Sequence, residues 1–391
     1  EVQVTASAEA STVSRMADGL RDAADRDSRP SSADRIAPWF TGVTLVVAAG
    51  TLLAWGLTAG WGPALTATVA VLVVACPCAL ALSRPLAAAA GLGAAARRGL
   101  LLRNADALLD LGTVEVVALD KTGTVTAGAM EVLEARDDVL RVAAGLERFS
   151  RHPVALAIVR EAVARGIPLP KAREVRETAG VGITGVVDGR LWHLESGGPG
   201  AVHLLDEGGV RRSIRLGDRI RTDARSVVGE LESLGTEVVL MTGDQAEVAR
   251  RVAEAAGINS WEAGMRPDEK AARVRERVAR GQRILFAGDG LNDGPALAAA
   301  DVGVAMGTGA ASSILVADGV VGSPSLGALS GGIRASRAAA RVVRLNQWRS
   351  IAYNVLAVSL AAAGFINPLA AAVLMPLSSA LVVGSAAGVD R

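Results

Sequence analysis

The stretch VEVVALDKTGT, residues 114–124, decides how the rest of the chain is interpreted. Its first half is a short run of strand-forming residues, apolar except for Glu115, which predicts a buried parallel strand. In an open α/β sheet the ligand crevice lies at the carboxyl ends of the strands, so Asp120 is expected there. A carboxylate can accept a phosphoryl group covalently, and Lys121 and the backbone N–H groups around Gly123 can hold phosphoryl oxygens. The alternative is an aspartate that only caps the following turn.

The composition lies between that of soluble and membrane proteins. The chain has 391 residues, enough for two or three domains, and half of them are hydrophobic. The mean hydropathy of +0.35 is high for a purely soluble protein. Lys and Arg number 41 against 40 Asp and Glu, and only 3% of the residues are aromatic. We therefore expect no nucleic-acid partner, because neither a basic nor a base-stacking surface is predicted.

Two pairs of apolar runs predict four membrane helices, arranged as two hairpins. The runs occupy residues 36–60 and 64–82 within segment 36–111, and residues 351–366 and 369–387 within segment 326–391. Runs of about this length can cross the roughly 30 Å of hydrocarbon in a bilayer.

Arginines give the orientation of both hairpins. They cluster at the open ends, at Arg21, Arg26, Arg29, Arg35, Arg84, Arg97, Arg98 and Arg103 and at Arg334, Arg337, Arg341 and Arg344. By the positive-inside rule these ends are cytoplasmic. The prediction is a multi-pass protein of the cell (inner) membrane with a cytoplasmic headpiece, preceded by a polar segment at residues 1–35.

The middle of the chain predicts an α/β domain with an insertion. Strand-like runs at 114–119, 236–241, 283–287 and 301–305 alternate with helical patterns at 244–257 and 268–281. Asp244 is the expected N-cap of the first helix and Gly257 its C-terminal stop. Such alternation implies a parallel sheet with right-handed crossovers. Residues 127–215 interrupt the pattern, which leaves 112–126 and 216–325 for the α/β domain.

Two further loops bring polar groups to strand ends. They read Thr242-Gly243-Asp244 and Gly288-Asp289-Gly290-Leu291-Asn292-Asp293. Each loop alone is explained by ordinary turn chemistry. Together with Asp120 they place several carboxylates in one crevice, where the charges repel unless a cation is present. Mg²⁺ suits such a set of oxygen ligands.

The motif Asp-Lys-Thr-Gly-Thr at 120–124 resembles the phosphorylation signature of the P-type ATPases, and the resemblance covers nearly the whole chain. It implies a haloacid-dehalogenase-like phosphorylation domain, an inserted α+β nucleotide-binding domain at 127–215, and ATP and Mg²⁺ as cofactors. It assigns the Mg²⁺ to Asp120, the Thr122 carbonyl and Asp289, supported by Asn292 and Asp293. It assigns catalytic roles to Asp120, Lys121, Thr122, Thr242, Gly243, Asp244, Asn292 and Asp293, and phosphate binding to Lys270, which alone would be an ordinary surface lysine.

A nucleotide site is implied by a second group of residues. Ser150-Arg151-His152-Pro153 is similar to the family's Ser-Glu-His-Pro element, with Arg151 in place of the acid. Glu147 stands five residues before His152, and the resemblance places both against adenine. Gly180-Val181-Gly182 would line the same pocket. A lone His-Pro is otherwise a helix start, and the dinucleotide-type glycine pattern at 180–185 lacks the strand–turn–helix context that such a site needs.

A metal site is implied inside the membrane. The motif Cys76-Pro77-Cys78 resembles the ion site of heavy-metal P-type ATPases, whose partner helices would supply Tyr353, Asn354, Met375 and Ser379. A disulfide between residues two apart in a helix is expected to be geometrically poor. Thiolate and thioether ligands select a soft ion such as Cu(I). Zinc-exporting relatives carry a membrane-embedded lysine and aspartate here, whereas residues 351–389 contain neither.

Part of the family pattern is missing. The motif Thr-Gly-Glu of the actuator domain does not occur, and residues 4–40 resemble only the segment that follows it, so that residues 1–35 would be a remnant of that domain or a linker. The prediction is ATP-driven Cu(I) export by what looks like the C-terminal portion of a pump, either a fragment or a degenerate copy, in a lipid bilayer and with a copper chaperone as a candidate partner. The alternatives are a pump of the Zn/Cd type, a tethered phosphohydrolase, and a metal-binding remnant without turnover.

Overall fold

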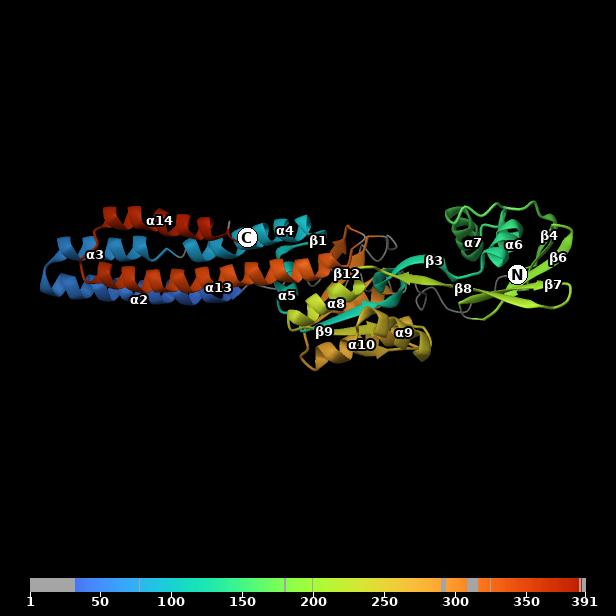
Figure 1. Cartoon of the computed structure of the whole chain (residues 1–391). Helices are drawn as coiled ribbons and strands as arrows, with labels where there is room; N and C mark the ends of the chain where they lie inside the picture. The colour runs from blue at the N-terminus through green and yellow to red at the C-terminus, as the bar shows by residue number, and fades with distance from the viewer. Residues whose placement is uncertain are drawn as a thin grey trace, which may run out of the picture. The chain divides into compact units, whose positions relative to one another are not determined.

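The computed structural model describes residues 32–76, 78–178, 181–198, 200–289, 293–307, 316–323, 325–386 and 388. They divide into two compact units (Figure 1), one from Glu1–Asp120 and Arg225–Arg391 and the other Lys121–Ala224. The first unit holds a mostly parallel sheet and a helical bundle, and the second holds an antiparallel sheet with two helices.

A seven-stranded sheet organises the first unit, in the order β1, β13, β12, β11, β2, β9, β10. The strands are β1 (Leu100–Leu102), β2 (Val116–Asp120), β9 (Glu237–Met241), β10 (Ser260–Glu262), β11 (Ile284–Gly288), β12 (Val302–Met306) and β13 (Gly319–Val321). All neighbours are parallel except β1, which is antiparallel to β13. Strands β2, β11 and β12 are buried at every position, as expected for a parallel sheet covered on both faces. The predicted buried strand before Asp120 is therefore confirmed.

Short helices accompany this sheet. They are α5 (Ala105–Leu111), α8 (Ala224–Ser233), α9 (Ala246–Ala256), α10 (Pro267–Ala279) and α11 (Gly294–Ala299). One core cluster joins Phe286 of β11, Val274 of α10 and Leu297 of α11. Helix α9 ends at Gly257, whose φ of 75° lies in the left-handed region that favours glycine, as predicted. Its predicted N-cap was wrong by one residue, because Gln245 occupies that position.

The second unit is an α+β sandwich of one sheet and two helices. Its antiparallel sheet has the order β3, β8, β7, β6, β5, β4, with β3 (Thr126–Glu134), β4 (Arg173–Thr178), β5 (Gly182–Val187), β6 (Arg190–Ser196), β7 (Ala201–Asp206) and β8 (Arg211–Ile220). Helices α6 (Asp137–Glu147) and α7 (Pro153–Ala164) pack on one face, where Leu140, Ile158 and Leu204 are buried in a common core. Strands β3 and β8, which carry the chain in and out, extend beyond the predicted range 127–215.

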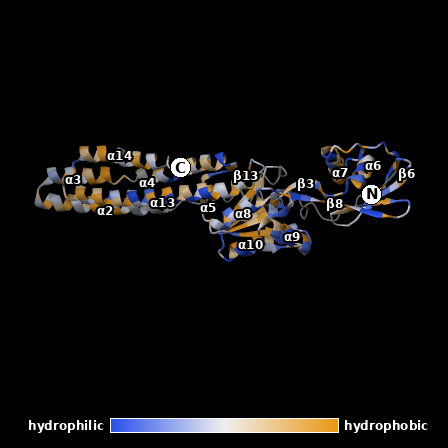
Figure 2. Cartoon of the chain, viewed as in Figure 1, coloured by the Kyte–Doolittle hydropathy of each residue, from blue (hydrophilic) through white to orange (hydrophobic). Residues whose placement is uncertain are grey.

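The helical bundle consists of α2 (Ser32–Thr58), α3 (Trp61–Val74), α4 (Cys78–Arg97), α13 (Gly327–Ala362) and α14 (Pro368–Ala386), which lie side by side in Figure 1. Hydrophobic residues predominate along α14 (Figure 2). Four membrane helices were predicted. Within the described residues, Thr41–Thr58 and Pro368–Ala386 are long and apolar enough to cross a membrane, while Trp61–Val74 is apolar but shorter.

The structure corrects two predicted elements of the bundle. Residues 64–82 do not form one helix, because α3 ends at Val74 and α4 begins at Cys78. A proline in the sequence between them removes a backbone donor and disfavours a continuous helix. The arginine-rich segment and the apolar run at 351–366 are not separate, because α13 runs through both without a glycine or proline to stop it after Gly332.

Candidate functional site

Asp120 is the last residue of β2, at the carboxyl edge of the seven-stranded sheet. In the register of the sheet it lies opposite Met241 of β9, while Leu119 lies opposite Ala287 of β11. The chain adds β9 and β10 on one side of β2 and then returns to add β11 on the other. Asp120 therefore stands where the strand order reverses, the position at which open α/β sheets bind ligands.

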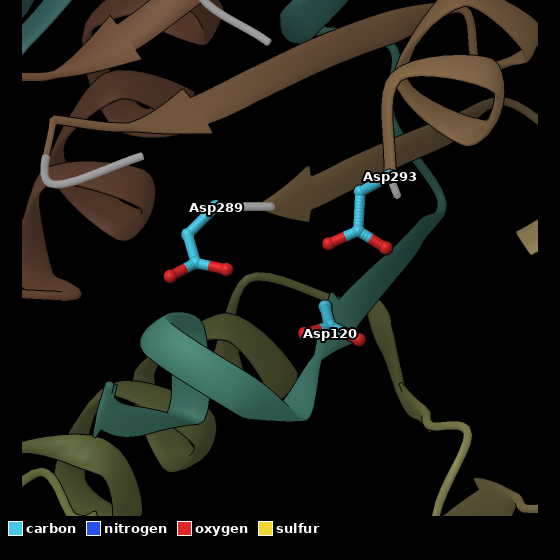
Figure 3. Close-up of side chains that lie close together, drawn as sticks. All are labelled: Asp120, Asp289 and Asp293. Atoms are coloured by element: carbon cyan, nitrogen blue, oxygen red, sulfur yellow. The ribbon is translucent and has the colours of Figure 1, made fainter. Parts of the chain in front are cut away.

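Three carboxylates converge at this edge (Figure 3). Asp120, Asp289 and Asp293 each place an oxygen so that the three atoms lie within 4.8 Å of one another. Asp289 follows β11 and Asp293 precedes α11, so neighbouring strand ends supply the group. Asp120 and Asp293 are only 5% and 3% exposed, which makes their mutual repulsion costly.

Lys270 of α10 ties two of these carboxylates together. Its Nζ donates hydrogen bonds to Asp120 and, over 3.0 Å, to Asp293. Burial alone would lower the pKa of Lys270, but the two aspartates outweigh it and raise that pKa. Burial, reinforced by Asp293, raises the pKa of Asp120 to about 6 although Lys270 opposes the change. One ammonium cannot balance three carboxylates, so the site favours a further cation.

The donor set fits Mg²⁺. It consists of carboxylate oxygens, and Asp289 is partly exposed, so ligands from solution can complete the coordination of an ion. Of the residues predicted to hold the ion, the structure brings Asp120 and Asp289 together with Asp293 beside them. Thr122 lies in the other unit and is exposed. Asn292 lies outside the described residues.

The loop Thr242-Gly243-Asp244 follows β9 and so borders Asp120 in the register of the sheet. Thr242 is 2% exposed, and its hydroxyl accepts a hydrogen bond from the Asp244 N–H over 3.1 Å. Its N–H donates to Glu262 and its carbonyl accepts from Met265. These bonds fix the loop, and a Cβ on Gly243 would lie 3.2 Å from the Met265 carbonyl oxygen.

The loop after the aspartate is held by residues that sequence reasoning missed. In the second unit, Arg221 donates from Nε to the Thr124 carbonyl and from Nη2 to the Gly123 carbonyl, each over 2.8 Å. The single hydroxyl proton of Thr126 is shared between Asp218 and, over 2.9 Å, the Lys121 carbonyl. Asp218 lies near the end of β8 and Arg221 directly follows the strand, about a hundred residues along the chain, and no local pattern marks them as partners of this loop.

The predicted adenine-site residues that the structure describes lie in the second unit. Glu147 ends α6, and Ser150 forms a side-chain hydrogen bond with it and accepts from the His152 N–H over 3.3 Å. His152 is the N-cap of α7, and its Nδ1 accepts from the Val154 N–H. Burial first, and then the charge of Glu177, raise the pKa of Glu147 to about 7. Glu177 is a residue that the sequence reading missed.

Gly182 begins β5, the strand paired with β4, which carries Glu177. It is paired with Thr178 of β4, and Glu177 is paired with the next residue, Ile183. Its φ of 141° and the Leu194 carbonyl oxygen only 2.1 Å from an added Cβ leave room for no side chain. Gly180 lies outside the described residues.

The predicted metal ligands lie on three helices of the bundle. Cys76 and Cys78 flank the break between α3 and α4, and they form a disulfide with their Cα atoms 5.4 Å apart. A poor disulfide geometry was expected for two cysteines within one helix, whereas the helix is interrupted here and the two residues do not share one. Metal binding by these sulfurs requires the reduced form. Tyr353 and Asn354 lie on α13, and Met375 and Ser379 lie one turn apart on α14, where the Ser379 hydroxyl donates to the Met375 carbonyl.

Comparison with known proteins agrees with this architecture. A model of haloacid dehalogenase-like hydrolases matches residues 114–301. The chain is 35% identical to Copper-transporting ATPase 1 of Rhizobium meliloti (strain 1021), over 90% of this chain and 48% of that protein. It is 35% identical to Probable copper-exporting P-type ATPase V of Mycobacterium tuberculosis (strain ATCC 25618 / H37Rv), over 90% of this chain and 50% of that protein. The chain thus spans about half the length of these curated relatives.

A solved structure extends the comparison to the fold. The crystal structure of a zinc-transporting PIB-type ATPase in the E2·Pi state superposes with a TM-score of 0.91 and 30% identity, covering 100% of this chain and 69% of that one. The predicted fold, a haloacid-dehalogenase-like domain with an inserted nucleotide-binding domain, is confirmed. The chain belongs to the P-type ATPases of the PIB type.

Proposed function

We propose that this chain carries the phosphorylation, nucleotide-binding and ion-binding parts of an ATP-driven pump that exports Cu(I) through an aspartyl phosphate. The observation that supports the chemistry best is the cluster of Asp120, Asp289, Asp293 and Lys270 at one edge of a parallel sheet. The copper-transporting names of the most similar sequences support the cargo. We propose that the helical bundle lies in the lipid bilayer of the cell (inner) membrane and that both β-sheets are cytoplasmic.

Asp120 is the nucleophile of the proposed reaction. One oxygen of its carboxylate attacks the γ-phosphorus of ATP, the bond from that phosphorus to the β,γ-bridging oxygen breaks, and ADP leaves with that oxygen. A pKa of about 6 leaves Asp120 mostly ionised at pH 7, so it can attack. Water later cleaves the acyl phosphate, releasing phosphate and restoring the carboxylate.

The surrounding groups orient the nucleophile and balance charge. Lys270 holds Asp120 and Asp293, and its ammonium is the group that stabilises the charge of the transferring phosphoryl group in the proposed reaction. Lys121, the next residue in the sequence, and the buried Thr242 loop are the further donors of the proposed site. Mg²⁺, when held by Asp120 and Asp289, neutralises phosphate charge. In the second unit, Glu147, His152 and Gly182 bind the adenine.

The ligand chemistry favours Cu(I) over Zn²⁺ as cargo. The helices offer two thiols, a thioether, a phenol and an amide, with no lysine and no carboxylate between Ile351 and Val389. Zn²⁺ prefers four strong N, O or S ligands, whereas thiolate and thioether sulfur select Cu(I). A copper chaperone is the proposed cytoplasmic donor of the ion. Because the superposed structure is of a zinc-transporting ATPase, a Zn/Cd-type pump is the second candidate.

Phosphate labelling tests the chemistry. The full chain, purified in detergent and supplied with Mg²⁺ and ATP labelled at the γ-phosphate, should acquire a hydroxylamine-labile label. Asp120→Asn should acquire none, because an amide cannot form the acyl phosphate. Equal labelling of the two proteins would refute Asp120 as nucleophile, and no label in either would favour a metal-binding remnant without turnover.

A further inference from the structure

A buried hydroxyl on α13 has no hydrogen-bond partner. Ser350 is 4% exposed, and its Oγ contacts neither a donor nor an acceptor among the described residues. Other serines of these helices behave differently, since Ser359 donates to the Val355 carbonyl and Ser379 to the Met375 carbonyl, each four residues back. In a low-dielectric interior an unpaired hydroxyl is unfavourable, so Ser350 calls for a ligand that the described side chains do not supply.

Ser350 belongs to the buried face of α13. That face carries Val343, Asn346, Ser350, Asn354, Ala357 and Ala361, spaced three or four residues apart. Asn346 exchanges hydrogen bonds of 2.6 and 2.9 Å with Ser385 of α14. The buried face of α13 is therefore turned toward the other helices of the bundle and away from the surrounding lipid.

The level of Ser350 along the bundle follows from two contacts. Ser83 of α4 donates to the Val343 carbonyl, and Val74 of α3 shares an apolar cluster with Ala357. Ser350 is midway between Val343 and Ala357, seven residues from each in the sequence. In the sequence, Cys76 and Cys78 lie between Val74 of α3 and Ser83 of α4, the segment that runs antiparallel to α13 through these two contacts. The unpartnered hydroxyl and the two sulfurs are therefore at the same depth.

We infer that Ser350 is a positioning residue of the ion site, whose hydroxyl donates a hydrogen bond to a cysteine sulfur when Cys76 and Cys78 are reduced and hold the ion. This inference rests on the proposed function. A thiolate is a charged acceptor, and placing it in the membrane without a donor is costly. A disulfide sulfur carries no such charge and is a weak acceptor, which agrees with the unpaired hydroxyl in the disulfide-bonded structure.

A Cu(I) titration of the full chain tests this role. The protein is kept in detergent under a phosphine reductant without oxygen, and Cu(I) is partitioned against a coloured Cu(I) chelator. Ser350→Ala should weaken Cu(I) binding roughly tenfold or more, the size expected for a hydrogen bond to a charged group. The thiolate-to-Cu(I) charge-transfer absorption should shift as well. Ser359→Ala, which removes an exposed hydroxyl from the same helix, should change neither quantity.

Ser350→Thr and Ser350→Val form a matched pair, because they have nearly the same shape and differ in the hydroxyl. Threonine should retain the affinity and the absorption band, and valine should lose both. Equal behaviour of these two variants, or wild-type behaviour of Ser350→Ala, would overturn the inference and leave Ser350 as a site for buried water. If the wild type itself holds Zn²⁺ in preference to Cu(I), the proposed cargo fails, while the threonine–valine comparison made with Zn²⁺ still tests the hydrogen bond.

Discussion

Gly288 and Asp293 are packed so closely that a single added carbon would collide with the carboxylate. A Cβ built on Gly288 would lie 2.7 Å from Oδ2 of Asp293 and 2.9 Å from its Cβ. Asp293 is 3% exposed and is held by Lys270, so it has little room to move away. The acidic site therefore requires glycine at position 288, the last residue of β11, because a larger side chain would collide with Asp293.

Gly288→Ala should impair phosphorylation without unfolding the sheet. The displaced Asp293 would disturb its hydrogen bond with Lys270, and misplacement of about 1 Å near a reacting group can cost about a hundredfold in rate. The measurement is the rate of label transfer from ATP to the full chain. Gly229→Ala is the control, because nothing lies within 4 Å of an added Cβ in that helix, and alanine there should keep the rate. Wild-type labelling by Gly288→Ala would contradict the packing argument.

The sequence predicted the parts of the fold that local chemistry determines. The strands that end at Asp120, Met241 and Gly288 are apolar runs stopped by polar or glycine residues, and their observed ends agree with the predicted ones within one residue. Strand β4 could not be read in this way, because residues 173–178 are all exposed and show no alternation. Its pairing with β5 depends on a partner strand, which a local pattern does not contain.

The site was predictable only in its individual residues. The motifs identified Asp120, Lys270 and Asp293 as candidates, but their mutual contacts join residues up to 173 positions apart and depend on the sheet order. The end of α3 at Val74 was missed because a proline can either kink a helix or end it, and the fused helix α13 was missed because arginines do not mark a helix end. Arg221 and Glu177 were missed because each acts on a residue distant in the sequence.

Arg221 should control the shape of the loop that follows the nucleophile. Its guanidinium makes two hydrogen bonds with neighbouring carbonyls, at Gly123 and Thr124, and a lysine has no fork to replace them. Arg221→Lys should therefore lower the rate of phosphate transfer about tenfold or more, with ATP affinity nearly unchanged because Glu147 and His152 are untouched. Labelling kinetics and binding of a fluorescent ATP analogue give the two quantities.

The control for this variant is a nearby arginine on β8. Arg219 makes only a long 3.7 Å ion pair with Glu131 and its side chain is 69% exposed. Arg219→Lys should behave like the wild type. A loss of ATP affinity equal to the loss of rate in Arg221→Lys would show that the arginine supports the whole unit and not the loop in particular.

Glu147 should make the second unit less stable as the pH rises. Its pKa in the folded chain is about 7, above the ordinary value of 4.5, because burial and Glu177 disfavour the charged form. The proton on the Glu147 carboxyl stabilises the folded state fully below pH 4.5. This stabilisation is lost as the pH rises through 7. The raised pKa corresponds to a loss of about 2 to 3 kcal/mol between pH 5 and 8. Glu147→Gln cannot ionise, so it should unfold at a higher temperature than the wild type at pH 8 and lose that advantage at pH 5.

Calorimetric unfolding of the full chain in detergent at pH 5, 6.5 and 8 measures this difference. Glu174→Gln, which changes a glutamate exposed on β4, should follow the wild type at all three pH values because surface substitutions of this kind alter stability by only about 0.5 kcal/mol. The repulsion between Glu147 and Glu177 also predicts that Glu177→Gln reproduces part of the gain at pH 8. If the difference between Glu147→Gln and the wild type does not grow from pH 5 to pH 8, Glu147 is ionised throughout this range, and the buried acidic pair does not govern the stability of the nucleotide-binding unit.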